Sequence, residues 1–421
     1  MTLRLATLAF AALLAAGSAT AATATVETPT IPATGDADDP AIWLNPTDAS
    51  KSLVITSAKN EGLRVYDLSG QQLQSLLPGK VNGQKSRLNN VDVQYNFLMG
   101  DGSRADLAVY TDRGQDILRI YKINPTGTPL TEVTSTAYTR LFPSQPVTDQ
   151  ATGYGLALWR DTANDKLYIL VTQRHGTGIA QYELVANANG SVGTQLVRSW
   201  SLPGTYQGVN LDNDAADMSP QSEGMVVDQQ TGMLYVGQED VGIWGINLHT
   251  GALGNAPLIE TKTFNPASPI TADVEGLTIR YGEKGEGVII ASSQGDNTFA
   301  AFDRKTFAHL GNFSIGASGS IDAVQESDGA DVTSFGLPGF EDGMFVTQDG
   351  YDGDVFDADA TNFKYVKWAD IVRDNPFLAP YANLPANFDP RNITPVPEPG
   401  SVALVLCGLG LVGVLRRRQR G

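Results

Sequence analysis

Short stretches of apolar residues, each ended by polar or turn-forming residues, recur along the whole chain. They alternate in hydrophobicity with a period of two or form short apolar runs, and they are rich in Val, Ile, Tyr and Leu, as expected of β-strands. The clearest stretches end in an aromatic or apolar residue followed by a turn, and they recur about every 55 to 65 residues: 62–70, 117–127, 179–190, 242–251, 298–306 and 362–370. The pattern indicates six copies of one structural unit.

Each unit contains two further strands upstream of the one just described. The middle strand ends in polar residues, as in LVITSAK and LAVYTDR, and the first strand begins with them, as in DDPAIWL and NNVDVQY. A unit of this size has too little apolar face to fold alone, so its copies must pack around a common axis. We predict an all-β fold, a six-bladed β-propeller over residues 23–390, in which the N-terminal segment ATATVETPTI joins the last blade and closes the ring. Two consecutive all-β domains are the alternative.

The two ends of the chain differ from its middle. Residues 1–22 combine a basic start, an apolar core and the small-residue sequence Ala19-Thr20-Ala21, which predicts a signal peptide. Residues 395–421 contain Pro-Glu-Pro, an apolar stretch that is short for a bilayer, and a cluster of arginines; a single-span anchor is one interpretation. In this order the three parts also resemble the PEP-CTERM sorting tail of exported bacterial proteins. That resemblance implies a secreted, periplasmic or surface position, with transient contact between the tail and the membrane or a sorting enzyme.

The composition limits the classes of partner that the protein can bind. Cys407, the only cysteine, falls in the tail, so the body must be stabilised by its core or by metal rather than by disulfides. The formal net charge of −17 argues against nucleic acid as a partner, because such binding needs a basic face. The acidity therefore represents either a solvated surface or a set of cation sites.

A propeller brings equivalent residues of every blade to the same height around its axis, so polar residues that interrupt the strands should form rings. The first strands contribute mostly carboxylates, whereas the middle strands contribute cations in blades 1 to 3 and carboxylates in blades 4 to 6. The first ring contains Asp38, Asp39, Asn90, Asp92, Tyr154, Glu223, Glu275 and Asp328. The second contains Lys59, Arg113, Arg174, His175, Glu239, Asp240, Asp296 and Asp349.

Carboxylates that converge in this way repel one another unless protons or cations intervene. Calcium accepts about six to eight oxygen ligands in loose geometry, whereas zinc is disfavoured because the body lacks cysteine and the chain has only three histidines. Facing such a cation cluster, Lys59, Arg113 and Arg174 would form a pocket for a multiply charged anion, since Arg binds phosphate through paired hydrogen bonds. The pattern thus predicts calcium beside a phosphate-binding site.

Several motifs occur in the order that is typical of one family: DDPAIW, NNVD, EGMVVD with LYVGQEDVGIW, VEGLTI with ASSQG, SDG, and TQDG with NFKYVKW. Over about residues 34–372 they resemble the β-propeller phytases, the calcium-dependent class that acts at neutral to alkaline pH. The resemblance implies a six-bladed propeller with structural calcium ions and a calcium-lined cleft. There, a 3-phytase-type phosphomonoesterase releases phosphate from calcium phytate, the salt of myo-inositol hexakisphosphate, by attack of a metal-activated water.

The matched motifs also imply which residues of this chain form the site. Phosphate contacts are implied for Lys59, Arg113, Tyr154 and Arg174. Calcium ligands or water-positioning groups are implied at Asp38, Asp39, Asp92, Glu223, Glu239, Asp273, Glu275, Asp322 and Asp328. Within this set, we also assign Glu223 and Asp328 to the catalytic group.

Two departures from the family pattern bear on pH optimum and calcium demand. Arg174 and His175 stand where many relatives carry Lys and an acid, and the run Asp322–Asp331 contains fewer aspartates than usual. A non-catalytic calcium-stabilised propeller that binds extracellular matrix or a surface partner is an alternative function. A lactonase propeller is disfavoured because an uncharged lactone needs no cationic pocket, and the RHGTG sequence at 174–178 lacks the Arg and Pro of histidine acid phosphatases. We expect a monomer.

Overall fold

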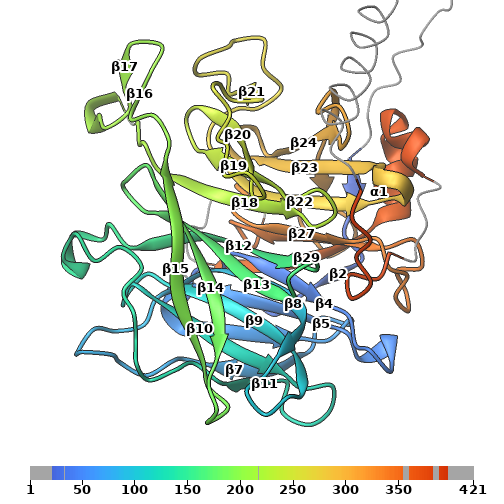
Figure 1. Cartoon of the computed structure of the whole chain (residues 1–421). Helices are drawn as coiled ribbons and strands as arrows, with labels where there is room; N and C mark the ends of the chain where they lie inside the picture. The colour runs from blue at the N-terminus through green and yellow to red at the C-terminus, as the bar shows by residue number, and fades with distance from the viewer. Residues whose placement is uncertain (1–20, 33, 217, 354–359, 383–387, 397–421) are drawn as a thin grey trace, which may run out of the picture.

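The computed structural model describes residues 21–32, 34–216, 218–353, 360–382 and 388–396. They form six sheets of antiparallel strands around one axis (Figure 1). Blades 1 to 3 contain β4 (Pro40–Trp43), β5 (Leu53–Ala58), β6 (Gly62–Tyr66) and β7 (Gln72–Leu76); β8 (Leu88–Leu98), β9 (Arg104–Asp112), β10 (Ile117–Ile123) and β11 (Leu130–Glu132); and β12 (Gly153–Asp161), β13 (Lys166–Gln173), β14 (Gly178–Ala186) and β15 (Val192–Ser201).

The second half of the ring repeats this order. Blades 4 to 6 contain β18 (Ser222–Asp228), β19 (Met233–Gln238), β20 (Gly242–Asn247) and β21 (Ile259–Glu260); β22 (Val274–Tyr281), β23 (Gly287–Ser293), β24 (Thr298–Asp303) and β25 (His309–Phe313); and β27 (Ala330–Thr333), β28 (Met344–Asp349), β29 (Ala360–Lys367) and β2 (Val26–Glu27). A small hairpin of β16 (Thr205–Tyr206) and β17 (Val209–Asn210) lies between blades 3 and 4.

The innermost strands close a circle, in which β4, β8, β12, β18, β22 and β27 contact one another in turn and β27 returns to β4. The N-terminus completes the last blade, because β2 pairs antiparallel with β29 and lies beside it in Figure 1. Two short strands, β1 (Ala22–Thr23) and β26 (Ile315–Gly316), pair in parallel, and β3 (Ile31–Pro32) also pairs with β29. The predicted six-bladed propeller closed by an N-terminal strand is confirmed, and the alternative of two separate all-β domains is wrong.

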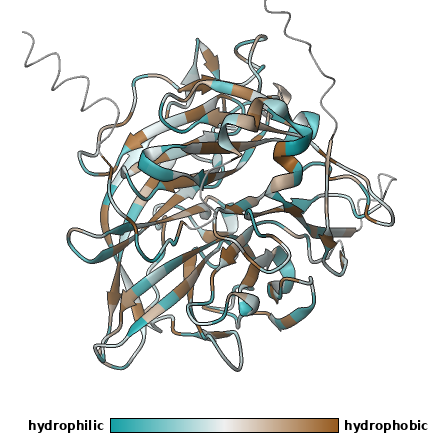
Figure 2. Ribbon diagram, turned by 90° about the vertical axis from the view of Figure 1, so that its right-hand side faces the viewer, coloured by the Kyte–Doolittle hydropathy of each residue, from teal (hydrophilic) through white to brown (hydrophobic). Residues whose placement is uncertain are grey.

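Apolar side chains pack between neighbouring blades. Hydrophobic residues follow the strands, whereas the connecting loops are mostly hydrophilic (Figure 2). For example, Leu107 and Val109 of blade 2 pack in one buried cluster with Leu158 and Ile169 of blade 3. Burying a side chain of this size contributes about 1.5–3 kcal/mol. Because a closed ring gives every blade two neighbours, inner strands such as β4 and β5 are buried on both faces, whereas outermost strands such as β7 and β15 are partly exposed.

Three aspartates join the innermost strands around the axis. Each carboxylate accepts the backbone N–H of a residue in the following blade: Asp39 from Val91 (3.0 Å), Asp92 from Leu158 (2.7 Å) and Asp331 from Ile42 (2.8 Å). The same three aspartates line a small axial cavity of about 60 Å³. These bonds satisfy backbone N–H groups of the innermost strands that are buried and have no partner strand on that side.

The last described residues, 388–396, cross the end of the axis at which the innermost strands finish; we call them the C-terminal strap. Phe388 stacks on Tyr281 with ring centroids 4.3 Å apart. Arg391 donates to Asp106 Oδ2 (2.7 Å) and lies over the Tyr95 ring (4.3 Å). The strap therefore covers this end of the propeller and is held there by stacking and ion pairing.

Helices contribute little to the described part of the chain. One α-helix occurs there, α1 (Trp368–Asp374), directly after β29. Within the described ranges, no helix has the length and apolarity needed to span a membrane. The predicted signal peptide and sorting tail fall outside the described residues, apart from 21, 22, 395 and 396.

Candidate active site

Most of the predicted site residues lie where the innermost strands begin. In β8, β12, β18 and β22 the pairing register shifts after the first residue, so that each strand has one residue more than its partner. Such a β-bulge redirects side chains from the sheet's regular alternation, and bulges are frequent next to active sites. The bulges contain Asn89 and Asn90, Tyr154 and Gly155, Glu223 and Gly224, and Glu275 and Gly276. Blades 2 to 5 thus present polar side chains at the same end of the axis.

Three glutamates from blades 4 and 5 converge at this end. Carboxylate oxygens of Glu223, Glu239 and Glu275 lie within 4.8 Å of one another, and all three side chains are buried. Among the described residues, no hydrogen-bond partner reaches Glu239 Oε1 or Glu275 Oε2. Burial and then repulsion from Glu223 raise the pKa of Glu239 and of Glu275 well above its usual value. Buried carboxylate oxygens without donors are stabilised by a proton or a cation.

Lys59 binds the aspartates that precede the first and last blades. Its Nζ lies 3.1 Å from Asp36 Oδ2, 3.3 Å from Asp38 Oδ1 and 3.1 Å from Asp328 Oδ2. Although burial favours the neutral amine, the three carboxylates raise the pKa of Lys59 well above its usual value. Burial raises the pKa of Asp38 to about 6, against the lowering effect of Lys59. Lys59 is therefore charged throughout the neutral range.

Two guanidinium groups flank the ring of Tyr154. Arg113 Cζ lies 5.5 Å and Arg174 Cζ 5.9 Å from the ring centroid, which is within cation–π range. Burial raises the pKa of Tyr154 well above its usual value, so its hydroxyl remains protonated. Arg113, Tyr154 and Arg174 thus form one group of two cationic side chains and one hydroxyl.

Glu223 connects the cationic and acidic halves of the site. Burial raises its pKa, Asp38 raises it further, and Lys59 and Arg113 lower it, which places these charges in one electrostatic unit. Asn89 Nδ2 also donates to Glu223 Oε1 (2.5 Å). An open cleft of about 510 Å³ adjoins the cluster and is lined by Glu239, Asp273 and His175, among others. The structure thus brings together Lys59, Arg113, Tyr154, Arg174, Asp38, Glu223, Glu239, Asp273, Glu275 and Asp328.

The family model for phytases matches residues 2–395. The chain belongs to the phytase family. The phytase is 35% identical over 368 residues to the 3-phytase of Bacillus subtilis (strain 168), and the match covers 86% of each chain. Its residues 395–419 match the PEP-CTERM protein-sorting motif, which indicates export to the cell envelope or surface. Among solved structures, the computationally designed Ika8 protein has a TM-score of 0.34 and 12% identity, covering 78% of the phytase and 71% of the designed chain, and this low likeness carries no structural argument.

Two predicted calcium ligands of the phytase lie in the axial cavity rather than in the glutamate cluster. Asp39 and Asp92 each give one oxygen to the next blade, and the other oxygen of Asp92 accepts the N–H of Val93 in its own strand (2.6 Å). Burial raises the pKa of Asp92 to about 7. These contacts assign both residues a role in joining blades, and their role as calcium ligands stays a prediction.

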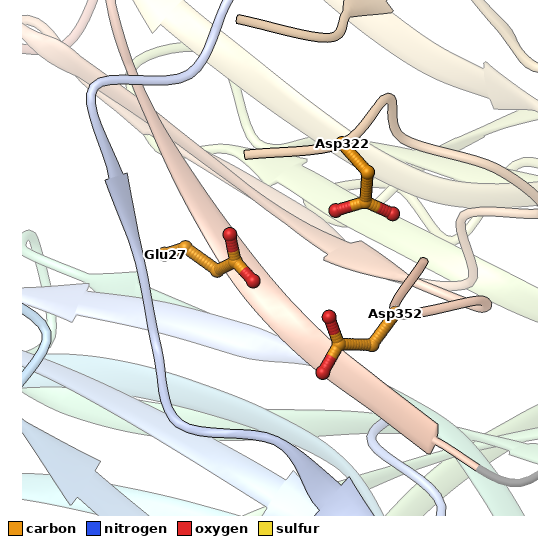
Figure 3. Close-up of side chains that lie close together, drawn as sticks. All are labelled: Glu27, Asp322 and Asp352. Atoms are coloured by element: carbon orange, nitrogen blue, oxygen red, sulfur yellow. The ribbon is translucent and has the colours of Figure 1, made fainter. Parts of the chain in front are cut away.

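Asp322 belongs to a second group of acids in the phytase, separate from Asp328. Figure 3 shows the carboxylates of Glu27, Asp322 and Asp352 pointing toward one another, and one oxygen from each lies within 4.8 Å of the others. The buried Lys364 donates to Asp322 and to Asp349 Oδ2 (2.5 Å). This group joins the N-terminal strand β2 to the loops that precede β27 and follow β28, segments that are distant in the sequence.

Two members of the predicted second ring have partners elsewhere. Asp349 pairs with Lys364, and Asp296 accepts hydrogen bonds from Lys262 (3.0 Å) and Thr271 (2.6 Å). The expected carboxylates of blades 5 and 6 in that ring are thus engaged by neighbouring loops and strands. The second ring of the phytase contributes Lys59, Arg113, Arg174 and Glu239 to the site, and its His175 and Asp240 line the adjoining cleft.

Sequence reasoning missed four residues of the two acidic groups: Asp36, Asn89, Glu27 and Asp352. Asp36 lies only two residues before the DDPAIW motif, and Asn89 is the first residue of NNVD. Glu27 lies in the segment that was expected to close the ring, and the register of β2 with β29 would have placed it beside blade 6. No motif marked Asp352.

Proposed function

We propose that this phytase is a calcium-dependent phosphomonoesterase that converts phytate to lower inositol phosphates and orthophosphate. The observation that carries the proposal is the meeting of a cationic wall (Lys59, Arg113 and Arg174) with a buried glutamate cluster in one site. The carboxylates alone would repel a multiply charged phosphate ester. Cations bound among them would reverse the sign of the local field and allow phosphate to approach.

The carboxylate cluster has the composition of a calcium site. The orphaned oxygens of Glu239 and Glu275 are hard anionic donors, and Glu223 adds a third within 4.8 Å. Asp38, Asp273 and Asp328 would supply further oxygens from the surrounding loops. Calcium bound there would withdraw charge from a phosphate ester and make a bound water more acidic.

The cationic residues of the chain bind and orient the phosphate. Arg113 and Arg174, both held against the Tyr154 ring, present planar donor groups that match phosphate oxygens. Lys59 adds a permanent point charge beside Asp328. These groups stabilise the negative charge that spreads over the phosphoryl oxygens in the transition state. Water serves as the nucleophile, so the reaction needs no Ser, Cys or His nucleophile.

Phosphate release from phytate tests the proposal directly. The purified protein should release orthophosphate from phytate in calcium buffer at neutral to alkaline pH. Excess chelator should stop the release, because the metal-free glutamate cluster would repel the substrate. Added calcium should restore it. A colorimetric phosphate assay measures both effects. Calcium-dependent stability without phosphate release would favour a non-catalytic propeller that binds a matrix or surface partner.

The second acidic group supports the proposal of a structural calcium ion. Its three carboxylates come from segments that are distant in the sequence, and an ion held among them would fasten the N-terminal strand to blade 6. Lys364 neutralises part of the charge through Asp322, which leaves Glu27 and Asp352 without a lysine or arginine partner among the described ion pairs. Such an ion would oppose opening of the ring at its closure point.

We expect Glu27→Gln to weaken calcium-dependent stability while leaving catalysis intact. Calcium raises the melting temperature because it binds only the folded state. Glu27→Gln would weaken that binding, so the calcium-induced rise in melting temperature should fall by about half or more. Phosphate release well below the melting temperature should stay within about twofold of wild type. Differential scanning calorimetry with and without calcium measures the first effect. The exposed Glu283→Gln is the matched control, and an unchanged calcium response in Glu27→Gln would rule out this site.

The sorting motif completes the proposal. We infer that the catalytic domain works as a monomer outside the inner membrane, whether secreted, periplasmic or retained at the surface. The match to residues 395–419 supports removal of the tail by a sorting enzyme after transient contact with the membrane.

A further inference from the structure

We infer that the glycines that directly follow the site residues are positioning residues: where the innermost strands begin, the main chain of one blade rests against the start of the next, and this spacing holds the carboxylates together. The residues are Gly155, Gly224, Gly276 and Gly329. Their spacing role stands on geometry alone, whereas its effect on calcium rests on the proposed function.

The two closest contacts surround the glutamate cluster. A Cβ added at Gly155 would lie 1.9 Å from the carbonyl oxygen of Glu223, and one added at Gly224 would lie 1.8 Å from that of Glu275. In both cases the obstacle is backbone of the next blade, which cannot rotate away as a side chain could. Gly155 thus packs against the backbone of Glu223, and Gly224 packs against the backbone of Glu275.

The series continues into blades 6 and 1. Gly276 donates its N–H to the Asp328 carbonyl at 2.6 Å, and a Cβ on Gly276 would lie 2.8 Å from that oxygen. A Cβ on Gly329 would lie 2.3 Å from Asp39 Oδ1 and 2.8 Å from the Asp38 carbonyl. Four consecutive blade boundaries are therefore built from the same contact, a glycine against the main chain or carboxylate of the next acidic segment.

Conformation alone does not require glycine at these positions. None of the four has the positive φ that favours glycine, so alanine could adopt the same backbone angles. The neighbouring bulge is what excludes a side chain. At Gly224 the contact would have to open by more than 1 Å before it reached the 3.0 Å that Cβ atoms ordinarily tolerate. That movement would separate Glu223 from Glu275, whose oxygens now lie within 4.8 Å of each other.

A glycine at the opposite end of the propeller provides a matched control. A Cβ on Gly100 would lie 2.1 Å from the carbonyl oxygen of Asn187. Gly100 is therefore also a point at which blade 2 packs against the backbone of blade 3. Gly100 lies two residues after Leu98, the last residue of β8, and is distant from the bulge at Asn89. Alanine at Gly100 therefore imposes a similar clash without touching the site.

The test compares Gly224→Ala with Gly100→Ala in the full-length protein. We expect the crystal structure of metal-free Gly224→Ala to show the bulges of blades 4 and 5 separated by an additional 1 Å or more. Calorimetric titration with calcium, well below both melting temperatures, should show at least about a tenfold loss of affinity at the glutamate cluster. Gly100→Ala should lower the melting temperature comparably but keep calcium affinity within about twofold of wild type.

Each outcome has a separate meaning. Bulges that accommodate the Gly224→Ala methyl without separating would overturn the inference, as would an equal loss of calcium affinity in Gly100→Ala. If the bulges separate but the wild-type cluster binds no calcium, the positioning role stands and the calcium proposal fails. Gly155→Ala, which acts on the contact with Glu223, serves in place of Gly224→Ala if that variant does not fold.

Discussion

Replacing Glu275 with glutamine is expected to lower phosphate release from phytate by about 10³-fold, the loss typical when an electrostatic group is removed from a preorganised site. Glutamine keeps the size of the side chain but removes one of the three charges that converge within 4.8 Å. The cluster would then hold calcium weakly, while the repulsion that destabilises the metal-free protein would decrease. The melting temperature in chelator should therefore rise although activity is lost.

This opposite movement of activity and stability distinguishes a functional carboxylate from a structural one. Phosphate release measured over a range of calcium concentrations, together with calorimetry in chelator, gives both values. Glu283→Gln, at an exposed position, should change neither. Retention of more than about a tenth of wild-type activity in Glu275→Gln, or a large fall in its melting temperature, would show that Glu275 is mainly part of the scaffold.

In the absence of calcium, the protein is expected to lose stability as the pH rises from about 4 to 7. The folded state raises the pKa of Asp38 to about 6 and that of Asp92 to about 7, in both cases mainly through burial. A raised carboxyl pKa means that the folded chain binds more protons than the unfolded chain over this window. The stabilisation is complete below the unfolded pKa near 3.8 and is lost as the pH passes through the folded values. At about 1.4 kcal/mol per pKa unit, Asp38 alone accounts for about 3 kcal/mol.

Calcium should reverse this trend, because ionised carboxylates are its ligands and binding becomes stronger as they lose protons. Melting temperatures recorded from about pH 4 to 8 in chelator and in calcium test both statements. Asp38→Asn should flatten the chelator curve, since its amide does not titrate. A metal-free protein that becomes more stable toward pH 8 would contradict the assignment of burial as the dominant influence on these carboxyls.

Much of the fold could be predicted because it depends on a local pattern repeated six times. Each blade can be recognised from strand-length apolar runs separated by turns. Because the units repeat around one axis, equivalent positions lie at the same end of that axis. Lys59, Tyr154 and Glu275 could be placed together on that ground alone, without any knowledge of their contacts. The closing role of the N-terminal segment followed from the need to cover the last blade's edge.

The parts that could not be predicted depend on register and on contacts between distant segments. Asp38 and Asp39 are adjacent in sequence, yet Asp38 faces Lys59 whereas Asp39 faces the axial cavity, because neighbouring residues in extended chain point in opposite directions. The partnership of Glu27 with Asp352 arises only when the first and last strands meet. The bulges that direct Glu223 and Glu275 toward one another are visible only in the strand pairing.

The C-terminal strap determines how the enzyme would be presented to its surroundings. The strap covers the finishing end of the innermost strands, whereas the candidate active site occupies their starting end, and the sorting motif begins within the strap, at residue 395. A domain tethered through this motif would stand with its cleft facing outward, accessible to a bulky, highly charged substrate. Release from the tether would leave the mouth of the cleft unchanged, because the strap and the cleft lie at opposite ends of the innermost strands.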